Sequence, residues 1–225
     1  GFYPYPDGRQ QKPAEPPVPA VDLADLSVWI DPRRADAHAA LAAVVAAAGA
    51  TVETGAAPSP AALILLAPLG EDATGAALAL AVDPARAVAV DTLLPLARRR
   101  TAMTTPVTAP AMRDAAHALL AADGTAVTVV RDSAGLVAQR ILAAIVNVGC
   151  DIAQQRIATP SDIDRAVELG LGYPKGPLAL GDALGPGRVL AILEAMQTFY
   201  GDPRYRPSPW LKRRARLGVS LTTAE

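Results

Sequence analysis

The residue types that usually perform acid–base, nucleophilic or metal chemistry are scarce in this sequence. Its 225 residues include two histidines, His38 and His117, and one cysteine, Cys150. A histidine can act as a general acid or base near neutral pH, but both lie in predicted helices, where we expect structural or solvent-exposed roles. Cys150 lies in an apolar stretch, which favours a small core residue over a nucleophile. Because no Cys and His cluster has metal-ligand spacing, the sequence predicts no metal site.

Two serines were considered as nucleophiles. Ser133 and Ser208 have no histidine near them in the sequence, so a catalytic triad would need partners from distant segments. The sequence alone therefore predicts a fold without an evident active site.

Dinucleotide binding depends on the turn between the first predicted strand, 26–30, and the helix that follows. The pyrophosphate needs a glycine-rich turn that lets the backbone approach it. This turn reads Asp31, Pro32, Arg33, Arg34, Ala35, Asp36. It has no glycine, and Pro32 lacks an N–H. Arg33 and Arg34 could attract a phosphate, but we interpret them as an exposed helix start, so no cofactor-binding residue is predicted.

The elements that position these residues alternate between apolar runs and helical patterns up to residue 130. The predicted strands are 26–30, 61–67, 87–90 and 126–130, with 51–53 and 100–104 less certain, and the predicted helices are 35–48, 71–81 and 109–122. Such alternation is typical of a doubly wound, mainly parallel sheet, here of five or six strands.

After Asp132 the strand signal ends and the pattern is helical. Residues 136–152 are apolar nearly all round, which predicts a central buried helix. Thr159 and Pro160 are typical of a helix start, and Gly170 of its end. Further helices are predicted from Pro177, over 188–200 and over 209–217. The second half is therefore predicted to be a bundle of about five helices.

Composition restricts the partners and the compartment. Lys and Arg total 21 against 22 Asp and Glu, and 51% of residues are hydrophobic, which is typical of a globular protein. Basic residues cluster only at 98–100 and 212–216, so we expect no nucleic-acid partner. The apolar run 61–67 is too short for a bilayer and no leader opens the chain, so we expect no membrane partner. A single cysteine favours the cytoplasm.

Three segments, in order, resemble one known family. Residues 131–140 (RDSAGLVAQR) resemble DSPGFxxNR, the passage between two domains. Residues 159–182 (TPSDIDRAVELGLGYPKGPLALGD) match S-x-E-D-I-D-x-A-M, L-G-x-G-x-P-M-G-P and L-x-D without gaps, and residues 201–218 (GDPRYRPSPWLKRRARLG) match a closing segment. The chain is thus similar to bacterial 3-hydroxyacyl-CoA dehydrogenases of the 3-hydroxybutyryl-CoA dehydrogenase type.

The resemblance also gives an expected domain organisation. The opening GFYPYP resembles the GRGFYDY ending of a helical domain in this family, and 6–19 is a Pro-rich linker. We expect 1–19 to be the end of a preceding helical domain and a linker, 20–131 a degenerate Rossmann-like domain, and 132–225 the helical C-terminal domain. The expected fold class is α/β followed by all-α.

The family's catalytic residues carry over poorly. Its histidine lies in HFFNP, and the nearest match here, 102–106 (AMTTP), has none. Its partner glutamate has no counterpart. Its asparagine falls on Gln139, whose amide can donate and accept hydrogen bonds but is one methylene longer. Ser133 is retained, so the resemblance leaves Gln139 and Ser133 as candidate catalytic residues.

The resemblance implies an NAD-dependent parent enzyme that oxidises (3S)-3-hydroxyacyl-CoA to 3-ketoacyl-CoA in fatty acid β-oxidation or related catabolism. NAD and the acyl-CoA substrate would bind with a missing N-terminal catalytic half. This part would be non-catalytic, serve dimerisation or scaffolding, and form a homo-oligomer. Two alternatives remain: a CoA-binding module that uses Arg33, Arg34 or the 98–100 cluster, and a fragment with residual dehydrogenase activity.

Overall fold

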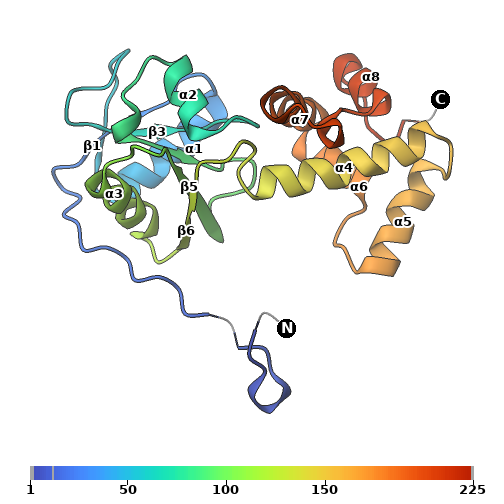
Figure 1. Cartoon of the computed structure of the whole chain (residues 1–225), viewed down its shortest axis with the longest axis horizontal. Helices are drawn as coiled ribbons and strands as arrows, with labels where there is room; N and C mark the ends of the chain where they lie inside the picture. Colours follow the sequence, from blue (N-terminus) through green and yellow to red (C-terminus); the bar gives the residue numbers. More distant parts are fainter. Residues whose placement is uncertain (1–2, 12, 224–225) are drawn as a thin grey trace.

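A computed structural model gives the structure of residues 3–11 and 13–223. An α/β part and a helical part lie side by side, with the long helix α4 leading from one to the other (Figure 1). The sheet has the order β2-β1-β3-β4-β5-β6, with β4 and β5 antiparallel and the other neighbours parallel. Its strands are β1 (Ser27–Ile30), β2 (Thr51–Val52), β3 (Leu63–Leu66), β4 (Ala87–Val90), β5 (Arg99–Thr104) and β6 (Ala126–Arg131). The predicted doubly wound, mainly parallel sheet is confirmed.

The sheet is covered by helices on both faces, which explains its continuous apolar runs. All four residues of β3 are fully buried, as expected for a central strand with both faces covered. Alternate side chains pack with α1 (Ala35–Ala47) and α3 (Pro110–Ala121) in one core, and with α2 (Ala73–Ala79) in another.

The helical part is a bundle around a separate core. Its helices are α4 (Ala138–Gln154), α5 (Pro160–Leu171), α6 (Pro177–Leu184), α7 (Pro186–Tyr200) and α8 (Pro209–Leu217), and short 3-10 helices lie at Pro6–Gly8, Pro84–Arg86 and Pro203–Tyr205. Buried side chains of α4, α6, α7 and α8 fill this core. Each of α5 to α8 has a proline in its first turn, where the missing N–H is not needed. The predicted helical second half is confirmed.

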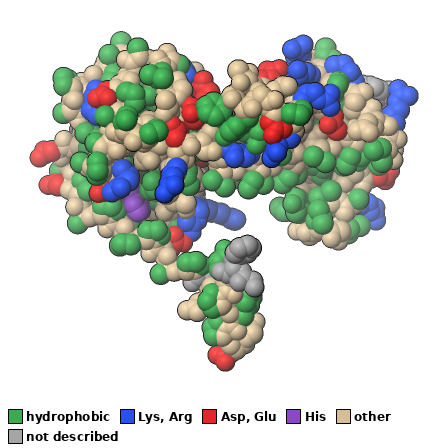
Figure 2. All heavy atoms as spheres, in the orientation of Figure 1, with side chains coloured by type: hydrophobic (Ala, Val, Ile, Leu, Met, Phe, Trp, Pro, Cys, Tyr) green, Lys and Arg blue, Asp and Glu red, His purple; other side chains and the backbone are tan. Residues whose placement is uncertain are grey.

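Two details of the helix predictions were wrong. Helix α5 ends at Leu171, and its left-handed cap is Gly172 with φ 67°, so Gly170 lies inside the last turn. Helix α4 is central but not buried all round, since Val137, Ile141 and Val148 are 48%, 54% and 60% exposed. A helix sequence that is apolar on most sides does not tell which face the rest of the fold covers. Hydrophobic side chains are correspondingly visible on the surface below α4 (Figure 2).

Residues 3–11 lie away from both parts (Figure 1). Gly1 and Phe2 of the expected domain ending lie outside the described residues, while Tyr3 and Tyr5 are exposed. In the described ranges, no helix has the length and apolar character that crossing a membrane requires. The same ranges contain no group of His, Cys, Asp and Glu that could hold a metal ion.

Candidate functional site

The crevice at the carboxyl ends of β1 and β3 is where a sheet of this topology would bind a ligand. From β1 the chain continues to β2 on one side, and β3 pairs with β1 on the other side. Connections that diverge in this way leave a crevice beyond the two strand ends. The segments that border it are the turn after Ile30 and the loop after Leu66.

The turn after β1 fills this position with its own side chains. Asp31 is 2% exposed and accepts hydrogen bonds from Arg33, with Nε 3.1 Å from each carboxylate oxygen and Nη2 2.8 Å from Oδ2. This hydrogen bond raises the pKa of Arg33 further above its usual value. Arg34 reaches across the next two strands, with Nη1 3.3 Å from the Ala67 carbonyl oxygen and 3.2 Å from Thr92 Oγ1.

An ion-pair chain ties this turn to the helical part. Asp36 Oδ2 lies 3.1 Å from Arg34 Nη2 and 2.5 Å from Arg188 Nη2, which belongs to α7. The side chains of Arg33 and Arg34 are only 34% and 19% exposed. The predicted helix start is confirmed, since Arg34 is the N-cap of α1 and Arg33 is exposed, but Arg34 is only half-buried and both guanidinium groups have partners within the chain.

Gln139 joins the two parts from the start of α4. Its side chain is fully buried. Oε1 accepts a hydrogen bond from the Gly70 amide at 2.7 Å, and Nε2 donates to the Pro68 carbonyl and to Asp91 Oδ1, both at 3.1 Å. Both amide hydrogens and the carbonyl oxygen are thus engaged, which gives this residue a structural role in the junction.

Ser133, the second predicted site residue, lies among different partners. Its Oγ accepts a hydrogen bond from Arg140 Nη2 at 2.5 Å and lies 3.3 Å from the Tyr200 hydroxyl. The same Nη2 donates to the Ala134 carbonyl, and the guanidinium stacks over the Tyr200 ring at 5.3 Å. The structure therefore places Gln139 and Ser133 in two separate hydrogen-bond groups with no shared partner.

Asp91, Asp132 and Gly70 belong to the junction although the sequence did not predict them there, and Gly135 lies in it as the resemblance implies. Asp91 directly follows β4 and is 7% exposed, a position at a strand end that could have marked it. Asp132 caps α2 by accepting hydrogen bonds from the Ala73 and Thr74 amides at 2.7 and 3.1 Å. Gly70 and Gly135 have φ of 87° and 81°, and a Cβ on either would overlap α7. Only the packed structure shows these contacts.

Among the described residues, no histidine stands at the family's histidine position. Within the same ranges, neither the His38 nor the His117 side chain hydrogen-bonds to the junction in a way that would let it act as a base there. Ala102, at the first position of the 102–106 segment, lies in β5 and is 1% exposed. His117 is 8% exposed on α3, and His38 is half-buried on α1.

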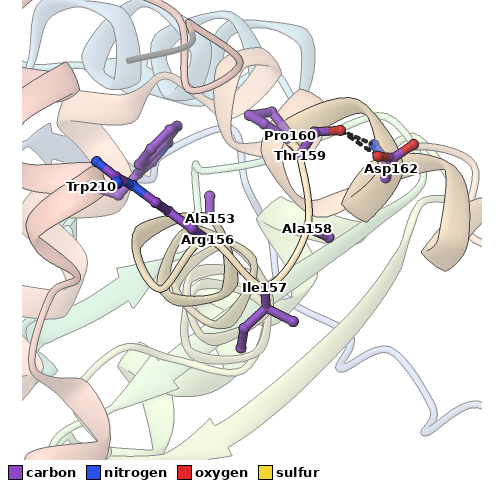
Figure 3. Close-up of a pocket in the computed structure, with 8 residues that line it drawn as sticks. All are labelled: Ala153, Arg156, Ile157, Ala158, Thr159, Pro160, Asp162 and Trp210. Carbon is purple, nitrogen blue, oxygen red and sulfur yellow. Dashed lines mark hydrogen bonds between the residues drawn. The ribbon is translucent and has the colours of Figure 1, made fainter.

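The hollow drawn in Figure 3 lies on the helical part, between the end of α4 and the first residues of α5 and α8. Its volume is about 580 Å³, and its lining includes Thr159, Asp162 and Trp210. The polar groups serve the start of α5, since Thr159 Oγ1 accepts a hydrogen bond from the Asp162 amide at 3.2 Å and donates to Asp162 Oδ2 at 2.6 Å. We therefore interpret it as a hollow at a helix corner.

Cys150 should be chemically inert in the folded chain. It is fully buried in the helical core, and this burial raises the pKa of its thiol to about 12. Because the thiolate is the reactive form, we expect the folded protein to show no labelling by a disulfide reagent at pH 8 and one equivalent after unfolding in guanidinium. Rapid labelling of the folded chain would contradict the core assignment.

The comparisons with known proteins fall mainly on the helical part. The family model for the 3-hydroxyacyl-CoA dehydrogenase C-terminal domain matches residues 135–223. The 3-hydroxyadipyl-CoA dehydrogenase of Escherichia coli K12 is 44% identical over 94 residues, which are 42% of this chain and 20% of that protein. The 3-hydroxybutyryl-CoA dehydrogenase of Clostridioides difficile is 40% identical over 87 residues, 39% of this chain and 31% of that protein.

Solved structures extend the likeness to the sheet. The crystal structure of E. coli 3-hydroxybutyryl-CoA dehydrogenase has a TM-score of 0.61 and 35% identity, covering 68% of this chain and 31% of that one. Mycobacterium tuberculosis FadB2 has a TM-score of 0.68 at 22% identity and covers 87% of this chain and 67% of that one, which supports the fold alone. The chain spans about a third or less of the two curated relatives. Residues 135–223 are a 3-hydroxyacyl-CoA dehydrogenase C-terminal domain.

Proposed function

We propose that this chain is the non-catalytic dimerisation or scaffold part of an NAD-dependent 3-hydroxyacyl-CoA dehydrogenase. The whole enzyme would oxidise a (3S)-3-hydroxyacyl-CoA to the 3-ketoacyl-CoA in the cytoplasm, as part of fatty acid β-oxidation or related catabolism. Hydride transfer and acyl-CoA binding would belong to a separate catalytic half, and this chain would hold that half in its assembly.

The observation that carries the proposal is the glycine-free turn after β1, whose two arginines are hydrogen-bonded within the chain. NAD is the cofactor that the family implies, and the turn after β1 does not fit it. A pyrophosphate needs backbone N–H groups and close approach, whereas Pro32 offers no N–H and Arg33 is held on Asp31. Arg34 lies over the ends of the next strands. We therefore assign no step of the reaction to this domain.

The role proposed for Gln139 is to fix the angle between the two parts rather than to contact substrate. Its three hydrogen bonds reach the loop after β3 and the end of β4. Ser133, through Arg140 and Tyr200, would brace the same corner from the end of α7.

The two alternatives have less support. A CoA-binding module would need free cations, but Arg33 and Arg34 are engaged, and Arg100 is 4% exposed with its guanidinium on Asp123 and two backbone carbonyls. Arg99 pairs with Glu15, which leaves the exposed Arg98 as the cation of this cluster that a CoA phosphate could reach. Residual dehydrogenase activity would need a base beside the substrate, and Gln139 is buried among hydrogen-bond partners.

An NADH-oxidation assay with acetoacetyl-CoA tests the proposal directly. We expect the purified chain to show no rate above the protein-free blank, and the Gln139→Asn variant, which restores the family's residue, to show none either. A complete 3-hydroxybutyryl-CoA dehydrogenase serves as the positive control. Turnover by the unmodified chain would overturn the non-catalytic assignment.

A further inference from the structure

A cleft of about 400 Å³ lies between the segment that begins α2 and the second half of α7. Three carboxylates line it: Glu71 and Asp72 come from the α/β part, and Glu194 comes from α7. Phe199, also on α7, is 56% exposed and adds an apolar surface to the lining. Each part of the chain therefore contributes one wall of this space, which we name the α2–α7 cleft, and both walls are acidic.

Asp72 has one carboxylate oxygen that the fold leaves without a partner. The residue is 9% exposed, and its Oδ1 caps α2 by accepting a hydrogen bond from the Gly75 amide at 2.7 Å. In the described ranges no group donates to Oδ2, which is not enclosed and is open to the cleft that Asp72 lines. Burial, with a smaller contribution from the neighbouring Asp132 carboxylate, raises the pKa of Asp72. A carboxylate in such surroundings is stabilised by a cation that donates a hydrogen bond.

The glutamates of the cleft are only weakly paired within the chain. Arg33 Nη1 lies 3.5 Å from Glu71 Oε2, and Lys212 Nζ lies 3.9 Å from Glu194 Oε1. Both distances exceed those of a hydrogen-bonded ion pair, and Arg33 places its hydrogen bonds on Asp31. The glutamate side chains are 41% and 45% exposed. The cleft thus retains negative charge that a ligand from solution can reach.

The arrangement of the carboxylates favours a ligand with two separated positive charges. In the described part of the chain, no set of acidic, His or Cys side chains is placed to share one metal ion. We propose that the α2–α7 cleft binds a linear aliphatic diamine. One ammonium group would lie at Asp72 and Glu71, and the other at Glu194. The methylene chain between them would pack on Phe199. Because an ammonium group has three N–H donors, one group suffices for both Asp72 Oδ2 and Glu71.

A diamine held by both walls would also stabilise the junction. Helix α2 belongs to the α/β part and α7 to the helical part, so both walls exist only while the two parts are in place. A ligand that binds the folded state alone adds RT ln(1 + [L]/Kd) to the free energy of unfolding. We therefore expect 1,5-diaminopentane to raise the midpoint of thermal unfolding progressively with its concentration. A midpoint that stays constant would contradict a ligand held between the two parts.

Calorimetric titration of the full chain with 1,5-diaminopentane at neutral pH tests the site directly. We expect saturable binding that weakens as salt is added, because the contacts are ionic. A monoamine of the same chain length, n-pentylamine, should bind at least about tenfold more weakly, since it loses the charge-assisted hydrogen bonds of one wall. Absence of saturable heat with the diamine, or equal affinity for the monoamine, would overturn the proposal. Tighter binding of a tetralysine peptide would overturn the assignment to a small ligand and favour basic side chains of a partner protein.

Two variants test the walls separately. Asp72→Asn keeps the cap of α2, because asparagine is as good an N-cap as aspartate, and should raise the diamine dissociation constant at least about tenfold. Glu194→Gln should do the same on the other wall. Asp83→Asn is the matched control and should bind as the unmodified chain does, since Asp83 also caps a helix, the 3-10 helix Pro84–Arg86, but does not line the cleft. Unchanged affinity in either wall variant would contradict the two-walled site. These results do not depend on the enzyme assay, which concerns the turn after β1.

Discussion

Replacing Gln139 by leucine should lower the free energy of unfolding by about 3–5 kcal/mol, since a buried unpaired polar group costs about 1–3 kcal/mol. Leucine fills a similar volume but returns none of the hydrogen bonds. The Gly70 amide and the Pro68 carbonyl would lose their partners inside the junction, and Asp91 Oδ1 would keep only the Leu93 amide.

Urea unfolding followed by circular dichroism measures this loss. Gln139→Asn keeps the amide but is one methylene shorter, so it should recover only part of the stability. Ser133→Ala is the control at the half-buried corner, with an expected cost of about 1 kcal/mol for its hydrogen bond. A leucine variant as stable as the unmodified chain would show that Gln139 does not hold the two parts together.

Gly70→Ala should lower the free energy of unfolding by about 2–5 kcal/mol. This adds the cost of a left-handed backbone at a non-glycine residue to the cost of overpacking the contact between the loop after β3 and α7. Gly70 has φ 87°, and an added Cβ would lie 2.7 Å from both Cα and O of Ile192 and 2.8 Å from Ala195 Cβ. Because two of these neighbours are backbone atoms of α7, the helix itself would have to shift.

Gly124→Ala separates the two causes. Gly124 has φ 82° but nothing within 4 Å of an added Cβ. Gly124→Ala should therefore lower the free energy of unfolding only by the cost of the left-handed backbone, about 1–2 kcal/mol. The comparison is made by thermal unfolding of both variants. Equal losses for Gly70→Ala and Gly124→Ala would contradict close packing of the loop on α7.

Local sequence patterns were sufficient to predict most elements of the fold. The run 63–66 is apolar without alternation because helices cover both faces of the sheet at this strand. Thr159 with Pro160 marks the start of α5. The antiparallel direction of β5 could also have been predicted. Only residues 91–98 connect β4 to β5, too few for the crossover that parallel strands need.

The junction depends on contacts between distant segments and was less predictable. The resemblance marked Gln139, but its partners come from loops about 50 to 70 positions earlier in the chain, and no local pattern links them. The sequence predicts the helix start at Arg33 and Arg34, but it does not show that their guanidinium groups bind Asp31 and Thr92. The exposed face of α4 was not predicted either, since apolar residues lie on most sides of this helix and the sequence does not show which of them the bundle covers.

The central claim is that the sheet of this chain does not take a dinucleotide, and calorimetric titration of the purified chain with NADH tests it most directly. The glycine-free turn and its hydrogen-bonded arginines predict no saturable heat of binding up to millimolar NADH, whereas a complete dehydrogenase titrated in parallel should bind. Saturable binding with a micromolar dissociation constant would contradict the account, because Arg33 and Arg34 would then have to leave Asp31 and Thr92 to admit the cofactor.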